Sequence, residues 1–470
     1  MIETMAEVRR RLRAGNLPDA LLAPQGGAVA GLSRSELRER AASVAGGLAA
    51  AGVRAGDRVG LYAANSPQWI VAYLAGQWLG AVMVPFNPAY RSAEVEHIVG
   101  DSDPALVIAD AERRPLVEPY RKVVSLESLP AGDPPTRPAL EPQSPALIIY
   151  TSGTTGRPKG ALLDHGNLLA QARGAIEAWR WTKGDRLVHA LPLFHLHGLG
   201  MGLHGSLMTG SSMTLIGFEP ERVVAELEAG GSIFFGVPAM YQRLADHLLG
   251  HPADLSRVRL FVSGSAPLPP ELFRRSEELF GQPPLERYGI TEGGIVVSNP
   301  YEGPRRPGRV GFPFAGVEVR LGDQDEIQLK GGQVFSGYWR NPAATAEAFE
   351  DGWFKTGDVG EIDADGSLAI RGRIKELIIS GGFNVYPREV ELVLEAHPGV
   401  AEVAVVGLPS ERWGEEVAAF VVPAGAQPSE EELITFAQSR LARFKCPRQV
   451  RFVAELPRNA MGKVQRSLLN

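Results

Sequence analysis

Tyr150-Thr-Ser-Gly-Thr-Thr-Gly-Arg-Pro-Lys-Gly160 follows the apolar run Ala146-Leu-Ile-Ile149, and this stretch decides the fold. The apolar run predicts a short buried strand, and the residues after it predict a turn. Glycines, hydroxyl side chains and Lys159 offer backbone N–H groups, hydroxyls and a mobile positive charge to phosphate oxygens. The segment lacks the Gly-Lys-Ser/Thr of the common nucleotide-binding loop, so we predict a phosphate-binding loop of another kind.

Length and composition indicate a globular enzyme with more than one domain. The chain has 470 residues, which is long for one hydrophobic core, and 44% of them are hydrophobic. A net charge of −6 gives no general basic surface, so we expect no nucleic-acid partner. The single cysteine, Cys446, excludes an internal disulfide and predicts a cytoplasmic protein. Apolar stretches end well before the ~18 residues of a membrane span, so we expect none.

Strand and helix patterns alternate before the phosphate-binding loop. Ser33-Arg-Ser-Glu36 is a capping box that predicts the start of a helix. Val59–Ala63 and Ala81–Pro85 are predicted strands, and Pro67–Leu79 between them is a predicted helix. Such alternation predicts parallel βαβ units. The expected fold class is therefore α/β, with a large N-terminal domain of mixed sheets flanked by helices.

After Gly372 the pattern changes to that of a small α+β unit. A helix is predicted over Pro387–Ala396 and strands over 401–406 and 417–422. A second capping box, Ser429-Glu-Glu-Glu432, predicts a further helix. We therefore expect residues 1–372 to form the large domain and residues 373–470 the small one.

Six motifs follow the loop, and together with it they match one known superfamily in their order and spacing. They are Leu191-Pro-Leu-Phe-His-Leu-His-Gly198, Val262-Ser-Gly-Ser-Ala-Pro267, Glu286-Arg-Tyr-Gly-Ile-Thr-Glu292, Trp353-Phe-Lys-Thr-Gly-Asp358, Gly372-Arg-Ile-Lys-Glu-Leu-Ile-Ile-Ser-Gly-Gly-Phe-Asn384 and Pro457-Arg-Asn-Ala-Met-Gly-Lys463. Over nearly its whole length the chain resembles the adenylate-forming superfamily of acyl-CoA synthetases, luciferases and peptide-synthetase adenylation domains. The resemblance implies that ATP activates a carboxylic acid as an acyl-adenylate, which then passes its acyl group to the thiol of coenzyme A.

The same resemblance implies where ATP and Mg²⁺ bind. Glu292, a hard oxygen ligand, and Thr151 would hold the metal, and with Lys159 and Lys463 they are the expected catalytic residues. Tyr288 would lie near the adenine and Asp358 would accept from the ribose hydroxyls. The nucleotide-binding residues expected in this way are Thr151, Ser152, Gly153, Thr154, Thr155, Gly264, Ser265, Ala266, Glu286, Tyr288, Gly289, Thr291, Asp358 and Arg373.

The small domain is expected to be mobile. By resemblance, Lys463 reaches the carboxylate and the α-phosphate while the adenylate forms, and Lys375 is the hinge. Rotation there would replace Lys463 with the segment Ser380, Gly381 and Gly382 for the thiol step. The two glycines would let the slender pantetheine arm of CoA pass close to the backbone.

Arg287 is the residue that bears on the identity of the acid. It precedes Tyr288, where the chain crosses the floor of the acyl pocket in the family. An arginine there is costly unless the substrate carries a second carboxylate. The motif that contains Arg287, with Val262-Ser-Gly-Ser-Ala-Pro267, Phe235-Gly-Val-Pro-Ala-Met-Tyr241 and Ser298-Asn-Pro-Tyr301, resembles malonyl-CoA synthetases of fatty acid metabolism. The resemblance implies that Arg287, Ser265 and His195, the expected gate of the acyl pocket, bind the acid. The expected substrate is malonate or methylmalonate.

Several alternatives stay open at this point. Arg287 would be silent towards substrate if a protein carboxylate paired with it. The stretch Gly293-Gly-Ile-Val-Val297 stands where a malonate enzyme is expected to have a more polar one, and it would admit methylmalonate or a longer acid. The competing functions are a medium- or long-chain fatty acyl-CoA synthetase and an adenylation enzyme that serves a carrier protein. His195, His197 and His204 match no zinc spacing, and the chain would be a monomer or a homodimer.

Overall fold

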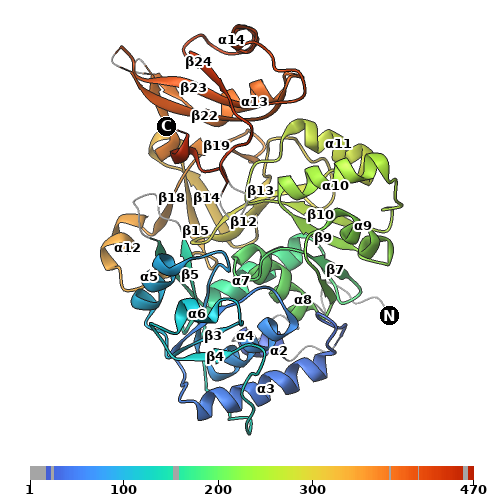
Figure 1. The fold of residues 1–470 in the computed structure, drawn as a ribbon, viewed down its shortest axis with the longest axis vertical. Coiled ribbons are helices and arrows are strands. Elements are labelled where there is room, and N and C mark those ends of the chain that lie inside the picture. Colours follow the sequence, from blue (N-terminus) through green and yellow to red (C-terminus); the bar gives the residue numbers. More distant parts are fainter. Residues whose placement is uncertain are drawn as a thin grey trace.

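The computed structural model describes residues 17–22, 26–151, 158–380, 383–410, 412–458 and 464–469. They form a large N-terminal domain and a smaller C-terminal domain, which lies at the top of Figure 1. Within the described residues, no helix has the length and apolarity needed to cross a membrane. The α/β fold class predicted from the sequence is confirmed.

The first sheet contains the strands on either side of the phosphate-binding loop. Its strands, in spatial order, are β16 (Gly337–Tyr338), β6 (Lys159–Asp164), β5 (Pro145–Thr151), β2 (Val82–Pro85), β1 (Arg58–Tyr62), β3 (Leu106–Ala109) and β4 (Val123–Ser125). From β5 to β4 the neighbouring strands are parallel, whereas β5, β6 and β16 run antiparallel. The parallel βαβ units predicted from the sequence are therefore present.

Helices of this half begin and end at residues with clear local signals. They are α2 (Leu17–Leu22), α3 (Arg34–Ala50), α4 (Pro67–Leu79), α5 (Ser92–Ser102) and α6 (Arg114–Val117). Ser33 and Glu36 form the predicted capping box of α3. Helix α4 has the predicted bounds, because Ser66 caps its first turn and Gly80 ends it at φ 68°, a conformation that glycine adopts without strain.

The second sheet includes the strand that carries Arg287. Its strands, in spatial order, are β13 (Phe312–Pro313), β12 (Gly294–Ser298), β11 (Leu285–Ile290), β10 (Leu260–Ser263), β9 (Ile233–Gly236), β7 (Arg186–His189) and β8 (Ser212–Leu215). The associated helices are α7 (His165–Ala178), the π-helix η1 (His197–Leu203), α8 (His204–Thr209), α9 (Pro220–Glu228), α10 (Pro238–Gly250) and α11 (Pro270–Phe280). Strands β8, β7, β9, β10 and β11 are parallel, so residues at their carboxyl ends gather at one edge.

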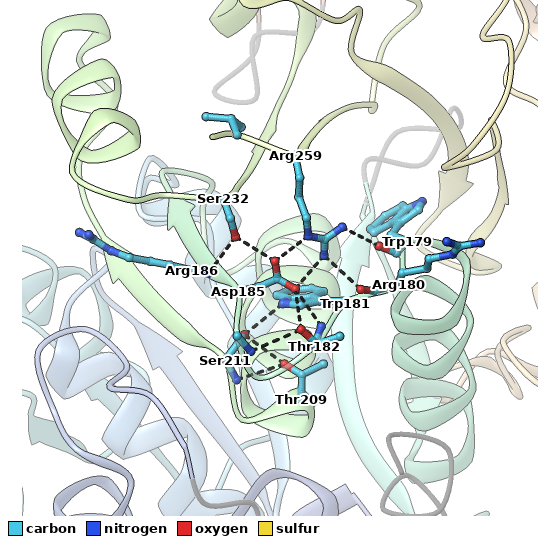
Figure 2. Close-up of polar contacts among 12 residues, drawn as sticks. Trp179, Arg180, Trp181, Thr182, Asp185, Arg186, Thr209, Ser211, Ser232 and Arg259 are labelled. Carbon is cyan, nitrogen blue, oxygen red and sulfur yellow. Dashed lines mark hydrogen bonds and ion pairs between the residues drawn. The ribbon is translucent and has the colours of Figure 1, made fainter. Parts of the chain in front are cut away.

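An ion pair between Asp185 and Arg259 links the amino ends of β7 and β10 (Figure 2). Asp185, just before β7, accepts from Nε and Nη2 of Arg259 at 2.6 and 2.7 Å. The same carboxylate accepts from the Ser232 hydroxyl and the Thr182 backbone N–H. Arg259 also donates to the Trp179 carbonyl at 3.0 Å, so both charged groups have several hydrogen-bond partners within the protein.

A third sheet connects the two halves to the C-terminal domain. Its strands are β14 (Val317–Leu321), β15 (Glu326–Gly331), β18 (Trp353–Ile362), β17 (Phe349–Glu350) and β19 (Leu368–Arg373), with α12 (Pro342–Ala348) beside them. The C-terminal domain then contains the sheet β21 (Phe383–Val385), β20 (Ile378–Ser380), β23 (Gly414–Pro423), β22 (Val400–Ser410) and β24 (Gln449–Phe452). Helices α13 (Pro387–Glu395) and α14 (Glu430–Gln438) cover it, and Ile378, Val390 and Leu433 belong to a hydrophobic core of its own.

Candidate active site

Thr151 and Lys159 stand opposite each other at the two ends of the phosphate-binding loop. They are paired residues of the antiparallel strands β5 and β6, so the sheet fixes their separation. Ser152, Gly153, Thr154 and Thr155 lie outside the described residues. The strand before the loop is the buried one predicted from the sequence.

Glu292 lies against the end of β5. Its Oε1 accepts from the Thr151 hydroxyl at 3.3 Å and from the Tyr338 hydroxyl at 3.1 Å. Burial raises the pKa of Glu292. The Lys159 ammonium sits 5.3 Å from the centre of the Tyr338 ring. The half-buried carboxylate of Glu292, two hydroxyls and a lysine therefore lie together, and carboxylate and hydroxyl oxygens are suitable ligands for a divalent cation.

Tyr338 is a member of this group that the sequence motifs did not indicate. It reaches the group because the two-residue strand β16 pairs with β6, placing Tyr338 opposite Ala161. Tyr338 is therefore close to Thr151 in space, although it lies 187 residues after it in the sequence. The residues around the loop do not predict this contact, because it is made by a two-residue strand that is far away in the sequence.

Asp358, which the sequence predicts to accept from the ribose hydroxyls, lies on β18. The antiparallel pairing of β18 with β19 sets Asp358 opposite Arg373, whose Nε lies 2.9 Å from the carboxylate. The Tyr288 hydroxyl donates to the other oxygen at 2.6 Å. Asp358 raises the pKa of Arg373 more strongly than burial lowers it. A buried carboxylate, a cation and an aromatic ring are thus held together by three strands.

Gly264, Ser265 and Ala266 follow β10 at the acyl end, and Gly264 is required there. A Cβ at this position would lie 2.4 Å from the Arg287 guanidinium carbon. Ser265 has φ 69°, a left-handed conformation that is strained for a residue other than glycine. Ser265 and Ala266 are exposed, whereas Gly264 is buried beneath them.

Arg287, on β11, is a buried cation with no carboxylate beside it. Only 4% of the residue is exposed, and burial lowers its pKa to about 9. Its Nη2 donates to the Ser265 hydroxyl over a long 3.5 Å, and its Nε has no partner. No carboxylate in the described part of the chain forms an ion pair with it. The alternative in which a protein carboxylate neutralises Arg287 therefore finds no support among these residues.

Three histidines lie near Arg287, and all are neutral. Burial, followed by the charge of Arg287, lowers the pKa of His195 to about 4 and that of His197 well below its usual value. Burial alone lowers the pKa of His189 to about 4. Among the described residues there is no group of three or more histidine, cysteine or carboxylate side chains able to hold a metal. At neutral pH the three imidazoles are therefore uncharged.

Glu286, Gly289 and Thr291 lie on the same β11 segment but face different surroundings. Glu286 is buried, its Oε1 accepts from the Leu268 backbone at 2.9 Å, and burial raises its pKa to about 7. A Cβ at Gly289 would meet the Gly294 carbonyl at 2.4 Å, where the strand pairing shifts register. Thr291 is half-buried in the turn before β12. Glu286 thus holds the loop that carries Ser265.

Of the residues predicted to take part in the domain rotation, the structure describes Lys375 and Ser380. Lys375, in the short helix η3 (Ile374–Glu376), is exposed, and Ser380 is buried at the end of β20. Gly381, Gly382 and Lys463 lie outside the described residues. Arg466, three residues after Lys463, pairs with Glu376 and Glu391 at 2.8 Å each. The C-terminal segment is therefore tied to the residue that follows Lys375.

Comparison with known proteins assigns the family. Residues 14–339 match the AMP-binding enzyme family, and residues 389–463 match the AMP-binding enzyme C-terminal domain. The chain belongs to this family. It is 38% identical to a feruloyl-CoA synthase from an Amycolatopsis species, over 96% of each chain. It is 36% identical to an oxalate–CoA ligase of Arabidopsis thaliana, over 92% of this chain and 91% of the relative.

Two further similar proteins are a malonate–CoA ligase and the protein MatB. The chain is 36% identical to the mitochondrial malonate–CoA ligase of Bos taurus, over 87% of this chain and 80% of the relative. The structure of ATP-bound MatB from Rhodopseudomonas palustris is 38% identical and superposes with a TM-score of 0.92, over 97% and 98% of the two chains. The structure of the same protein without ATP superposes with a TM-score of 0.81. This AMP-binding enzyme is therefore a CoA ligase whose acid the relatives leave open.

Proposed function

We propose that this CoA ligase activates a short dicarboxylic acid, malonate or methylmalonate, and transfers it to coenzyme A. The observation that carries the proposal is Arg287, a buried guanidinium at the acyl end with no carboxylate partner among the described residues. A second carboxylate on the substrate would supply the missing counter-ion in bidentate fashion. Ferulate and fatty acids have no such charge at their far end.

Gly293 and Gly294 do not enlarge the acid-binding space, as their small size could suggest. A Cβ at Gly293 would meet Leu329 at 2.8 Å, and one at Gly294 would meet the Gln171 side chain at 2.6 Å. The room left by the glycines is thus filled by protein atoms. Their presence gives no reason to expect a long acyl chain.

The first half-reaction joins the carboxylate to AMP and releases pyrophosphate. We propose that Thr151 and the rest of the phosphate-binding loop hold the phosphates, with Lys159, and that Asp358 and Arg373 position the ribose. Glu292 and Thr151 offer the oxygen ligands that fit Mg²⁺, which would neutralise phosphate charge when bound. Thr291 would face the α-phosphate, and Lys463 would stabilise the charge that develops between the two anions.

The second half-reaction is proposed to follow rotation of residues 373–470 about Lys375. The thiol of CoA would then attack the acyl carbon past Ser380, Gly381 and Gly382, and AMP would leave. The higher TM-score with the ATP-bound than with the apo MatB structure supports an adenylating arrangement for the described domains. We place the enzyme in the cytoplasm, where ATP and CoA are available, as a monomer or homodimer.

The test is pyrophosphate release with and without CoA across a panel of acids. Malonate and methylmalonate should give the highest kcat/KM, ahead of oxalate, propionate, decanoate and ferulate, and EDTA should abolish the release. Thioester formation should require CoA and should not require a carrier protein. A preference for ferulate or decanoate would overturn the proposal while leaving the CoA ligase assignment intact.

A further inference from the structure

Helix α5 contacts the chain on both sides of the phosphate-binding loop. Nε2 of His97 lies 2.8 Å from the backbone carbonyl of Pro158, just before β6. The Asp101 carboxylate accepts from the hydroxyl of Tyr150, near the end of β5. His97 and Asp101 are four residues apart and therefore lie on the same face of the helix. One helix face thus reaches the strand that enters the loop and the segment that leaves it.

The direction of both hydrogen bonds follows from the groups that make them. A carbonyl oxygen only accepts, so His97 donates to Pro158 from a protonated Nε2. Burial, followed by the hydrogen bond and the charge of Asp101, raises the pKa of Tyr150, so its hydroxyl keeps its proton and donates. The rings of His97 and Tyr150 also meet edge to face, with centres 6.2 Å apart. The three side chains and the Pro158 carbonyl therefore form one connected group.

Trp339 links α5 to the strand that follows the loop. Its backbone N–H donates to the Gly160 carbonyl at 2.7 Å, and its indole N–H donates to the Asp101 carbonyl at 3.2 Å. Gly160 is paired with Tyr150 across β5 and β6, and a Cβ there would lie 3.3 Å from the Tyr150 ring. The helix is thus linked to both strands, and the strands to each other, at the base of the loop.

These contacts lie next to the two residues assigned to phosphate binding. Thr151 and Lys159 are the last pair of the β5–β6 ladder before the loop, and each follows one of the residues that α5 contacts. The end of a ladder opens locally more readily than its middle, because neighbouring pairs hold it on one side only. The side-chain contact across this pair is long, with the Thr151 hydroxyl 3.5 Å from the Lys159 carbonyl. Contacts from outside the ladder therefore add to the closure of this pair.

We propose that His97 and Asp101 are positioning residues, which keep the end of the β5–β6 ladder closed for the phosphates of ATP. The inference rests on the proposed role of Thr151 and Lys159 in phosphate binding. Groups that are held in place before a ligand arrives lose little conformational freedom when it binds. The two side chains should therefore strengthen ATP binding, whereas binding of the acid, which we place at β10 and β11, should not respond to them.

Single substitutions remove one contact at a time. His97→Leu cannot donate to Pro158, and Tyr150→Phe removes only the hydroxyl bound by Asp101. Each should raise the Kd of MgATP, measured by isothermal titration calorimetry, about 3- to 10-fold, the scale of one hydrogen bond. In pyrophosphate release with the acid that the wild type uses best, the KM for ATP should rise by the same factor. The KM for the acid should change by less than about twofold.

Conservative and distant substitutions provide the controls. His97→Gln keeps a donor near the position of Nε2, and Asp101→Asn keeps an oxygen that accepts from Tyr150, so both should stay within about twofold of the wild type. Glu96→Gln changes an exposed residue of the same helix and should leave the Kd unchanged. Asp101→Ala and Tyr150→Phe remove the same hydrogen bond, so the double variant should lose no more affinity than either single one.

The outcomes separate this inference from the proposed function. Lower folding stability in His97→Leu and Tyr150→Phe with an unchanged Kd for MgATP would show that the contacts serve only the fold. Equal rises in the KM for ATP and for the acid would also overturn the inference. Should His97→Leu fail to fold, Tyr150→Phe decides, because it removes a single oxygen.

Lys159→Ala tests the function beneath the inference. If this variant binds MgATP as well as the wild type does, the phosphate-binding role of the loop fails and the inference fails with it. If Lys159→Ala weakens binding and the variants of His97 and Tyr150 do not, the loop keeps its role and the positioning role of α5 is overturned.

Discussion

Arg259, which is partly buried, and Arg287, which is buried, are two arginines of the same sheet with opposite surroundings. Arg259, just before β10, pairs with Asp185 through two hydrogen bonds, whereas Arg287, on the neighbouring β11, has no carboxylate partner among the residues that the structure describes. Burial acts to lower the pKa of both guanidinium groups. At Arg259 the hydrogen bonds and charge of Asp185 prevail and raise it, but at Arg287 it falls to about 9.

The contrast separates an arginine that serves the fold from one available to a ligand. A buried charge is tolerated when it is paired and hydrogen-bonded, and the Asp185 pair meets both conditions. Arg287 has no carboxylate partner among the described residues and one long hydrogen bond, to Ser265, so its placement stores unfavourable free energy. Binding of an anion would recover that free energy, and this is the physical reason for assigning Arg287 to the substrate.

The sharpest way to break the comparison is Arg287→Ala. Removal of one member of a buried ion pair costs about 3–5 kcal/mol, so kcat/KM for malonate should fall by that amount, roughly 150- to 5,000-fold. Activity with acetate, propionate or butyrate should be unchanged or higher, because no charge is then left unpaired. Steady-state kinetics on both classes of acid checks this. A parallel loss on all acids would make Arg287 a structural residue like Arg259.

The matched change at the other arginine is Asp185→Asn. It should lower the free energy of unfolding by about 2–4 kcal/mol, since Arg259 is then left buried without its counter-ion. Urea denaturation followed by circular dichroism measures the loss. The folded variant should keep the wild-type preference among acids, because Asp185 is at the opposite ends of the strands from Ser265. A change in that preference would contradict the separation of roles.

The sequence predicted the elements near these arginines but not the contacts between them. Helix α4 and the capping box at Ser33 depend on neighbouring residues, so local signals suffice for them. The contact between His197 and Ser265 joins residues 68 positions apart, and Tyr338 reaches Glu292 through a two-residue strand. Such contacts are set by strand order and register, which periodicity along the chain does not encode. The lack of a carboxylate beside Arg287 likewise became visible only in three dimensions.

A pH titration tests the charge of Arg287 directly. Its pKa of about 9 in the free protein means that the guanidinium loses its proton above that pH, where it no longer attracts a carboxylate. Since kcat/KM reports free-enzyme groups, malonate kcat/KM should fall about fivefold from pH 9 to pH 10. Propionate provides the control and should show no such decline. Parallel profiles for the two acids would place the titration elsewhere in the site.

The smallest expected effect concerns stability, and it separates the two arginines most cleanly. The pKa of Arg287 is lower in the folded protein than in the unfolded chain, so the unfolded state binds more protons between about pH 9 and the usual arginine range. The charge therefore destabilises the fold below about pH 9, and stability rises with pH through that window.

Arg287→Met removes this charge and keeps most of the volume of the side chain. At pH 7 its free energy of unfolding should be equal to that of the wild type or up to about 1 kcal/mol higher, as when a hydrophobic group replaces a buried charge. Arg259→Met, measured under the same conditions, should be less stable than the wild type, because Asp185 is left without its cation. If the two methionine variants lost stability equally, Arg287 would have a protein partner after all, and the comparison between the two arginines would fail.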